Sequence, residues 1–96
     1  MQRNEHLLTI AAEECAETAQ RISKALRFTL TEIEPGQMYS NSARIMHEYC
    51  DIIASFEMLI EAGLVVMPTH AKRRILTKKA NVEKFLKLSA QLGTLE

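Results

Sequence analysis

Apolar residues recur at three- and four-residue steps between residues 4 and 28, which is the spacing of one face of an α-helix. This stripe consists of Leu8, Ala11, Ala12, Cys15, Ala19, Ile22 and Leu26. A second stripe of the same helix mixes charged and apolar residues and consists of Ile10, Glu14, Glu17, Arg21, Lys24 and Phe28. Because a purely solvated face would more often lack Ile10 and Phe28, we expect this helix to be covered on two sides. Asn4 is its expected N-cap.

Two further segments carry the helical pattern. Residues 42–62 present a broad apolar face and end at Gly63, a residue suited to the position after a helix; that face consists of Ile45, Tyr49, Ile52, Ile53, Phe56, Leu59 and Ile60. Residues 70–92 follow Pro68, which stops a continuous helix, and Thr69, the expected cap. The apolar residues of this segment that we expect to face inward are Ile75, Val82, Phe85, Leu86 and Leu92. No stretch shows strand-like alternation.

The segment between the first two helices, residues 29–41, breaks the pattern. Pro35-Gly36 predicts a turn, and Ser40, Asn41 and Ser42 offer capping groups for the helix that follows. A loop this long in so small a domain often has a function, such as covering a substrate. The predicted fold is therefore all-α: a small bundle of three main helices per chain, completed by oligomerisation into a four-helix-type core.

Chain length and charge indicate how many domains the protein has and which kinds of partner it is suited to bind. With 96 residues, residues 1–96 are expected to form a single domain whose own core is marginal. Yet 47% of the residues are hydrophobic, which suggests an oligomer. Lys+Arg and Asp+Glu are balanced at 12 each, so bulk charge offers no attraction to nucleic acid or to an anionic membrane. We expect a cytoplasmic protein, because no signal-peptide pattern or spanning segment is present.

The two cysteines, Cys15 and Cys50, both lie inside acidic patterns. Free buried thiols in a reducing cytosol are the ordinary expectation, while a cross-helix disulfide stays open at the level of sequence.

Those acidic patterns carry the candidate chemistry. Glu14 and Glu17 are three residues apart on the first helix, and Glu48 and Asp51 are three apart on the second. This spacing stacks two side chains on one helix face, so two such pairs on neighbouring helices can direct four carboxylates to one point. A set of carboxylates alone favours Mg2+, with Mn2+ as a substitute. The alternative is that the four are ordinary solvated surface acids.

The third helix supplies cations. Magnesium held by few carboxylates often takes further ligands from substrate phosphates, and lysines can neutralise phosphate charge. Lys78, Lys79 and Lys84 are the candidates for reaching such a site, although most of this basic face is expected to be solvated.

The two acidic patterns, Glu13-Glu14-Cys15-Ala16-Glu17 and Glu48-Tyr49-Cys50-Asp51, resemble the ExxE and ExxD signature of the MazG-like all-α nucleoside triphosphate pyrophosphohydrolases. That superfamily includes MazG, dimeric dUTPases and phosphoribosyl-ATP pyrophosphohydrolase. Asn81-Val82-Glu83-Lys84-Phe85 is similar to a later family feature, and the resemblance covers roughly residues 5 to 88. Thr77 stands where the family often has a lysine.

The resemblance implies Mg2+ bound by Glu14, Glu17, Glu48 and Asp51, and hydrolysis between the α- and β-phosphates to give a nucleoside monophosphate and pyrophosphate. Glu13 or Glu17 would orient the attacking water or accept its proton. Lys24, Lys78 and Lys84 would stabilise charge on the triphosphate. Residues considered for contacts to the substrate, including the nucleoside, are Lys79, Phe28, Tyr39, Asn81 and Phe85.

Two other functions compete with this enzyme. One is a non-catalytic helical module that binds a protein partner and keeps a residual metal site. The other is a nucleic-acid-binding bundle that uses the lysines between Lys72 and Lys87, against which the balanced charge argues. The sequence does not indicate the base preference.

Overall fold

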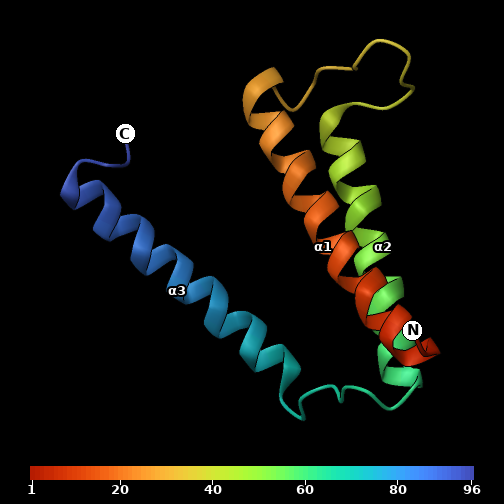
Figure 1. Ribbon diagram of the computed structural model, residues 1–96. Helices are drawn as coiled ribbons and strands as arrows, with labels where there is room; N and C mark the ends of the chain where they lie inside the picture. The colour runs from red at the N-terminus through yellow and green to blue at the C-terminus, as the bar shows by residue number, and fades with distance from the viewer. The chain divides into compact units, whose positions relative to one another are not determined.

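The computed structural model describes residues 1–96 and contains three helices and no strands, which confirms the predicted all-α class. The helices are α1 (Arg3–Phe28), α2 (Asn41–Glu61) and α3 (Ala71–Leu92), whose ends lie within one residue of the predicted ends (Figure 1). The chain divides into two compact units, Met1–Val66 and Met67–Glu96. The predicted single domain over residues 1–96 stays a prediction. No helix is long and apolar enough to cross a membrane.

In the first unit, α1 and α2 run antiparallel and pack along their lengths as a helical hairpin (Figure 1). The hydrophobic core lies at the end where the chain begins: Leu7 and Ala11 pack with Leu59, and Leu64 covers them. At the other end Ala25 is also buried. Because alanine adds little bulk, these positions let the two backbones approach closely.

The face of α1 that packs on α2 is one residue out of step with the predicted apolar stripe. We call the packed side of both helices the inner face; it consists of Leu7, Ala11, Glu14, Thr18, Arg21 and Ala25 on α1, and Asn41, Ile45, Glu48, Ile52, Ser55 and Leu59 on α2. All these residues are buried or half-buried, and they recur at alternating steps of three and four. Polar and charged side chains therefore occupy the middle of the hairpin.

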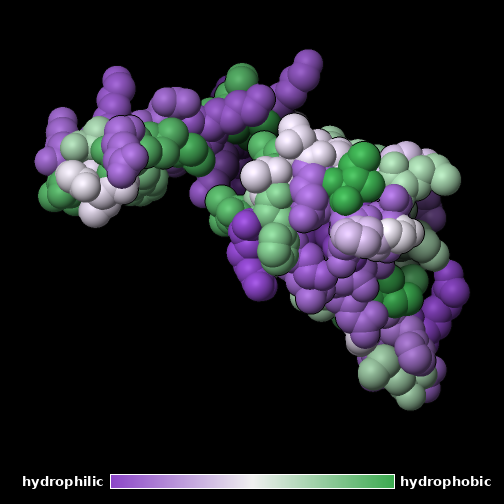
Figure 2. Space-filling model, turned by 90° about the horizontal axis from the view of Figure 1, so that it is seen from above, coloured by the Kyte–Doolittle hydropathy of each residue, from purple (hydrophilic) through white to green (hydrophobic).

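The predicted stripe itself is mostly exposed, because α2 covers only the inner face of α1; the expected cover on a second side of this helix stays a prediction. Leu8, Ile22 and Leu26 are 47%, 46% and 84% exposed, and only Ala11 of that stripe is buried. On α2, Tyr49, Ile53, Phe56 and Ile60 are also exposed. A two-helix hairpin covers one side of each helix, and here the covered inner face includes the charged residues Glu14, Arg21 and Glu48. Figure 2 shows the resulting mixture of hydrophobic and hydrophilic side chains on the surface.

The loop between α1 and α2 is fixed by hydrogen bonds rather than by apolar packing. Asn41, only 3% exposed, donates from its side chain to the Thr29 carbonyl oxygen at 2.8 Å and to Glu32 Oε1 at 3.1 Å. The backbone amides of Asn41 and Ser42 donate to the carbonyls of Glu32 and Leu30. Residues 29–32 are thereby held against the start of α2.

Turns and caps confirm some sequence expectations and correct others. Gln37 donates its amide to the Glu34 carbonyl across the predicted Pro35-Gly36 turn, and Gly36 has the positive φ of 85° that this turn requires. Ser40 caps α2 by accepting from the Ala43 amide, and Gly63 follows α2 with a φ of 74°. The expected caps Asn4 and Thr69 were wrong: Gln2 and His70 occupy the N-cap positions, and neither bonds the helix with its side chain.

The second unit contains α3 as its only helix, with no residue fully buried. The apolar residues expected to face inward are all exposed, and no other helix of this unit covers them. Their burial in a core stays a prediction.

Candidate functional site

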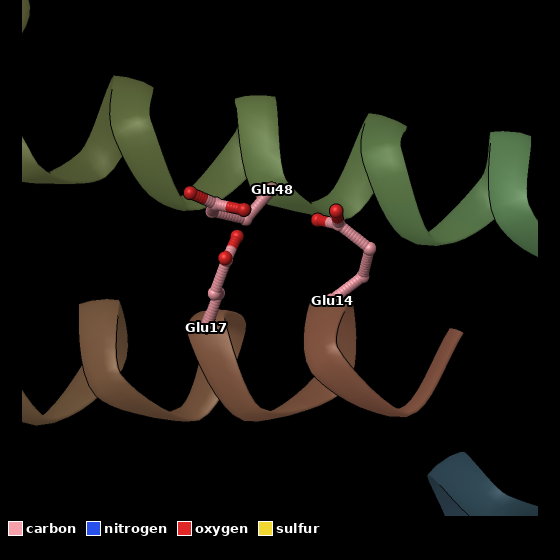
Figure 3. Close-up of side chains that lie close together, drawn as sticks. All are labelled: Glu14, Glu17 and Glu48. Carbon is pink, nitrogen blue, oxygen red and sulfur yellow. The ribbon is translucent and has the colours of Figure 1, made fainter. Parts of the chain in front are cut away.

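Three of the four predicted metal ligands come together on the hairpin. Glu14 and Glu17 extend from α1 toward α2, where Glu48 extends toward them (Figure 3). One carboxylate oxygen from each lies within 4.8 Å of the others. The convergence depends on the helix register: Glu14 and Glu48 occupy inner-face positions, and Glu17 is one turn along α1 from Glu14.

The fourth predicted ligand, Asp51, is exposed and is not part of the group that lies within 4.8 Å. Its negative charge nevertheless acts on the cluster and raises the pKa values of both Glu14 and Glu48. Asp51 is therefore at the edge of the cluster rather than in it.

The carboxylates perturb one another. Partial burial raises the pKa of Glu14, and the charges of Glu17, Asp51, Glu48 and Glu13 raise it further. Partial burial also raises the pKa of Glu48, followed by the charges of Glu17 and Asp51. Both effects act against the ionised form, because burial removes water and neighbouring anions repel. The site therefore favours a proton or another positive charge.

Arg21 is the cation that the protein itself places beside this cluster. Its Nε lies 4.0 Å from Glu48 Oε1, which is an ion pair at a distance too long for a hydrogen bond. Arg21 Nη1, Glu14 Oε2 and Glu48 Oε2 are all buried without a hydrogen-bond partner. Since buried polar atoms are usually paired, these three mark a place where further partners would be favourable.

The hairpin has two different sides around the inner face. The residues one position before the inner face include Glu13, Glu17 and Lys24 on α1, and Asp51 on α2. The residues one position after it are mostly apolar and exposed, such as Leu8, Ile22 and Ile53. One residue turns a helix by about 100°, so on two antiparallel helices the same offset leads to the same side of the hairpin. The candidate catalytic residues Glu13, Glu17 and Lys24 thus share the charged side with Asp51.

The remaining predicted site residues lie in the second unit. Lys78, Lys79, Asn81, Lys84 and Phe85 are all exposed on α3. Lys78 and Asn81 border one shallow hollow with Arg74 and Thr77. Their contact with a substrate stays a prediction.

The cysteines are free and exposed, so the expected burial of Cys15 and Cys50 was wrong. Cys15 is one residue after the inner-face position Glu14, and Cys50 is two after Glu48, which explains why neither is covered by the hairpin.

Sequence reasoning gave no site role to Arg21, which lies beside Glu48, or to the ion pair that Arg44, one helical turn before Glu48, forms with Glu34. Arg21 was assigned only to a mixed stripe, and Glu34 and Arg44 were assigned no role. Arg44 Nη1 donates to Glu34 Oε2 at 2.8 Å, and the Arg44 side chain is only 13% exposed. The available signal was the spacing: Arg44 is four residues before Glu48, and Arg21 is four after Glu17.

Comparison of the chain with protein-family models, with curated proteins and with solved structures finds no match.

The residues present fit a hard divalent cation. The donor set consists of carboxylate oxygens, two of which, Glu14 Oε2 and Glu48 Oε2, are buried and unpaired. Oxygen donors of this kind suit Mg2+ or Mn2+ and not zinc, which prefers nitrogen and sulfur.

Proposed function

We propose that this protein is a Mg2+-dependent nucleoside triphosphate pyrophosphohydrolase, which cleaves the bond between the α- and β-phosphates to give a nucleoside monophosphate and pyrophosphate. The observation that carries the proposal is the convergence of Glu14, Glu17 and Glu48 within 4.8 Å, because these three come from both of the sequence patterns that resemble the MazG-like signature. Mn2+ is the expected substitute metal.

In this proposal Glu14, Glu17 and Glu48 hold the metal, and Asp51 completes the set from the rim. Bound Mg2+ would supply charge neutralisation at the phosphates and a more acidic water. Glu13 or Glu17, on the charged side of the hairpin, orients the attacking water or accepts its proton. Lys24, half-buried on the same side, neutralises charge on the triphosphate. Lys78, Lys79, Asn81, Lys84 and Phe85 remain proposed contacts to the substrate.

The oligomer is part of the proposal: the enzyme acts as a homodimer or homotetramer. It is supported by the exposed apolar side of the hairpin, which we call the apolar side and which consists of Leu8, Ala12, Cys15, Ala19, Ile22 and Leu26 on α1, and Tyr49, Ile53, Phe56 and Ile60 on α2. These residues repeat at alternating steps of four and three, the spacing of a helix-packing surface. A second hairpin packed there would form four helices and leave the charged side open. The free thiols fit a cytoplasmic location.

Analysis of products tests the reaction. The purified protein is incubated with a panel of nucleoside triphosphates and Mg2+, and the phosphorus products are identified by 31P NMR. We expect monophosphate and pyrophosphate in equal amounts from at least one nucleotide. Diphosphate and orthophosphate would contradict the proposed cleavage position. No turnover from folded protein on any nucleotide would favour the alternative, a non-catalytic helical module that binds a protein partner.

A further inference from the structure

The loop between α1 and α2 places a carboxylate among cations next to the candidate metal site. Glu34, from the turn of this loop, accepts a hydrogen bond from Arg44 Nη1 at 2.8 Å. Arg44 is largely buried, with 13% of its side chain exposed, whereas the Glu34 side chain is 45% exposed. The fixed partner of this pair is therefore the arginine on α2, and the accessible partner is the glutamate of the loop.

The charges of two further cations also act on the same carboxylate. The hydrogen bond from Arg44 lowers the pKa of Glu34 most, and the positive charges of Lys24, Arg44 and Arg21 contribute beyond it. Arg21 and Lys24 are about one helical turn apart on α1, so their side chains are neighbours. Arg21 also lies beside Glu48 and keeps a buried Nη1 without an acceptor. Arg44 thus contacts the loop carboxylate, Arg21 lies beside the carboxylate cluster, and Lys24 is about one helical turn from Arg21.

A single carboxylate uses little of the hydrogen-bonding capacity of this group. Two guanidinium groups and one ammonium provide many donors, and guanidinium matches phosphate oxygens especially well. Glu34 satisfies one donor of Arg44. A polyphosphate, with several anionic oxygens, would engage all three side chains at once.

The loop does not depend on Glu34 for its position. Residues 29–32 are held by the backbone bonds of Asn41 and Ser42 to Glu32 and Leu30 and by the side chain of Asn41. Glu34 lies beyond these bonds, at the start of the Pro35-Gly36 turn. It can leave Arg44 while the anchored part of the loop stays in place.

We propose that Arg21, Lys24 and Arg44 form a polyphosphate-binding site and that Glu34 competes for it, so that the phosphates of the substrate must displace this loop carboxylate. The identity of the substrate rests on the proposed function; the competition for the anion site does not. Glu34 thereby lowers the apparent affinity for polyphosphate and makes the loop respond to substrate.

Calorimetric titration with inorganic tripolyphosphate, in EDTA and without divalent metal, tests the competition. If Glu34 occupies the site for 80–90% of the time, Glu34→Gln binds about fivefold to tenfold more tightly than wild type. Arg44→Gln binds tripolyphosphate more weakly than wild type, and the double variant with Glu34→Gln does not regain the wild-type affinity. The matched control is Glu32→Gln, which removes the same charge from the same loop but lies against Asn41, and its affinity stays near that of wild type.

Other results would overturn the inference. If the Glu34–Arg44 pair only holds the loop, Glu34→Gln lowers the melting temperature and leaves tripolyphosphate binding unchanged or weaker. The inference is also wrong if neither wild type nor Glu34→Gln binds tripolyphosphate although circular dichroism shows that both are folded.

Turnover separates this inference from the proposed function. If wild type hydrolyses a nucleotide but Glu34→Gln gains no affinity for tripolyphosphate, the proposed enzyme stands and the proposed competition by Glu34 is wrong. If Glu34→Gln binds tripolyphosphate more tightly but no nucleotide is turned over, the anion site stands and the proposed enzyme is wrong. Where both hold, Glu34→Gln lowers KM for the nucleotide more than it changes kcat.

Discussion

Three glutamates that repel one another are held together on a small hairpin, with Glu14 and Glu48 on the inner face and Glu17 beside it. Glu14 and Glu48 each keep one buried, unpaired oxygen, and the pKa values of both are raised. An arrangement of this kind opposes folding unless a positive charge compensates it. Arg21 supplies one positive charge beside Glu48, at 4.0 Å. The cluster therefore favours a proton or a further positive charge.

The stability of the metal-free protein should depend on pH for this reason. Because the folded-state pKa values of Glu14 and Glu48 are raised above 4.5, the folded protein binds protons before the unfolded chain does. Unfolding free energy should then rise as the pH falls toward 4.5 from above, and Glu48→Gln should reduce this rise. Urea unfolding in EDTA across that pH range measures the unfolding free energy of both proteins. An equal dependence of this free energy on pH in wild type and Glu48→Gln would contradict the account. Glu34 acts oppositely, since its lowered pKa makes its stabilisation fade as the pH falls below 4.5.

At the scale of the helices, the hairpin combines close packing at its ends with charge in its middle. Leu7, Ala11 and Leu59 pack at one end, and Ala25 is buried at the other. The small side chains of Ala11 and Ala25 let α1 and α2 approach closely, so that Glu14 and Glu48 can meet. The geometry of the site thus depends on alanines that take no part in the chemistry.

Enlarging one of these alanines should separate the helices. Ala11→Leu adds bulk at a position that is 5% exposed and should destabilise the fold by about 1–3 kcal/mol, as overpacking of a core does. Ala16→Leu makes the same change on the exposed outward side of α1 and should have little effect. Chemical denaturation compares the two variants, and equal stabilities would show that α1 does not pack by its inner face.

The sequence was sufficient for the helices and for the residues of the cluster, but not for the packed side of α1. Ser40, Gly36 and Gly63 act locally and their sequence signals were reliable, whereas the caps expected at Asn4 and Thr69 were wrong. The apolar stripe that includes Leu8 and Leu26 is more hydrophobic than the inner face, so the hydrophobic pattern did not indicate that the inner face packs on α2. Which side of a helix is covered depends on its partner. The Glu34–Arg44 pair joins a loop to a helix and has no local signal.

At the scale of the whole molecule, the two sides of the hairpin suit different roles. The charged side carries Glu13, Glu17, Lys24 and Asp51, and the apolar side carries side chains such as Ile22 and Ile53, which are 46% and 40% exposed. Contiguous apolar surface of this kind usually marks an interface. The proposed oligomer would therefore bury one side and leave the other for substrate.

Charge on the apolar side should break the oligomer. Ile22→Glu places a carboxylate on that side, whereas Ser23→Glu places the same charge on the neighbouring exposed position that points outward. Sedimentation equilibrium should give a dimer or tetramer for wild type and Ser23→Glu, and a smaller species for Ile22→Glu. A monomeric wild type would remove the oligomer from the proposal without affecting the carboxylate site.

The most direct test of the central claim is pyrophosphate release from a nucleoside triphosphate, measured against Mg2+ concentration in wild type, Glu48→Gln and the control Glu57→Gln. Glu57 is an exposed acid on the same helix, outside the cluster. The account predicts Mg2+-dependent turnover in wild type and Glu57→Gln, and a loss of about a hundredfold or more in Glu48→Gln, comparable to the loss of a key electrostatic group in other enzymes. Turnover in Glu48→Gln equal to that of wild type at every Mg2+ concentration would contradict it.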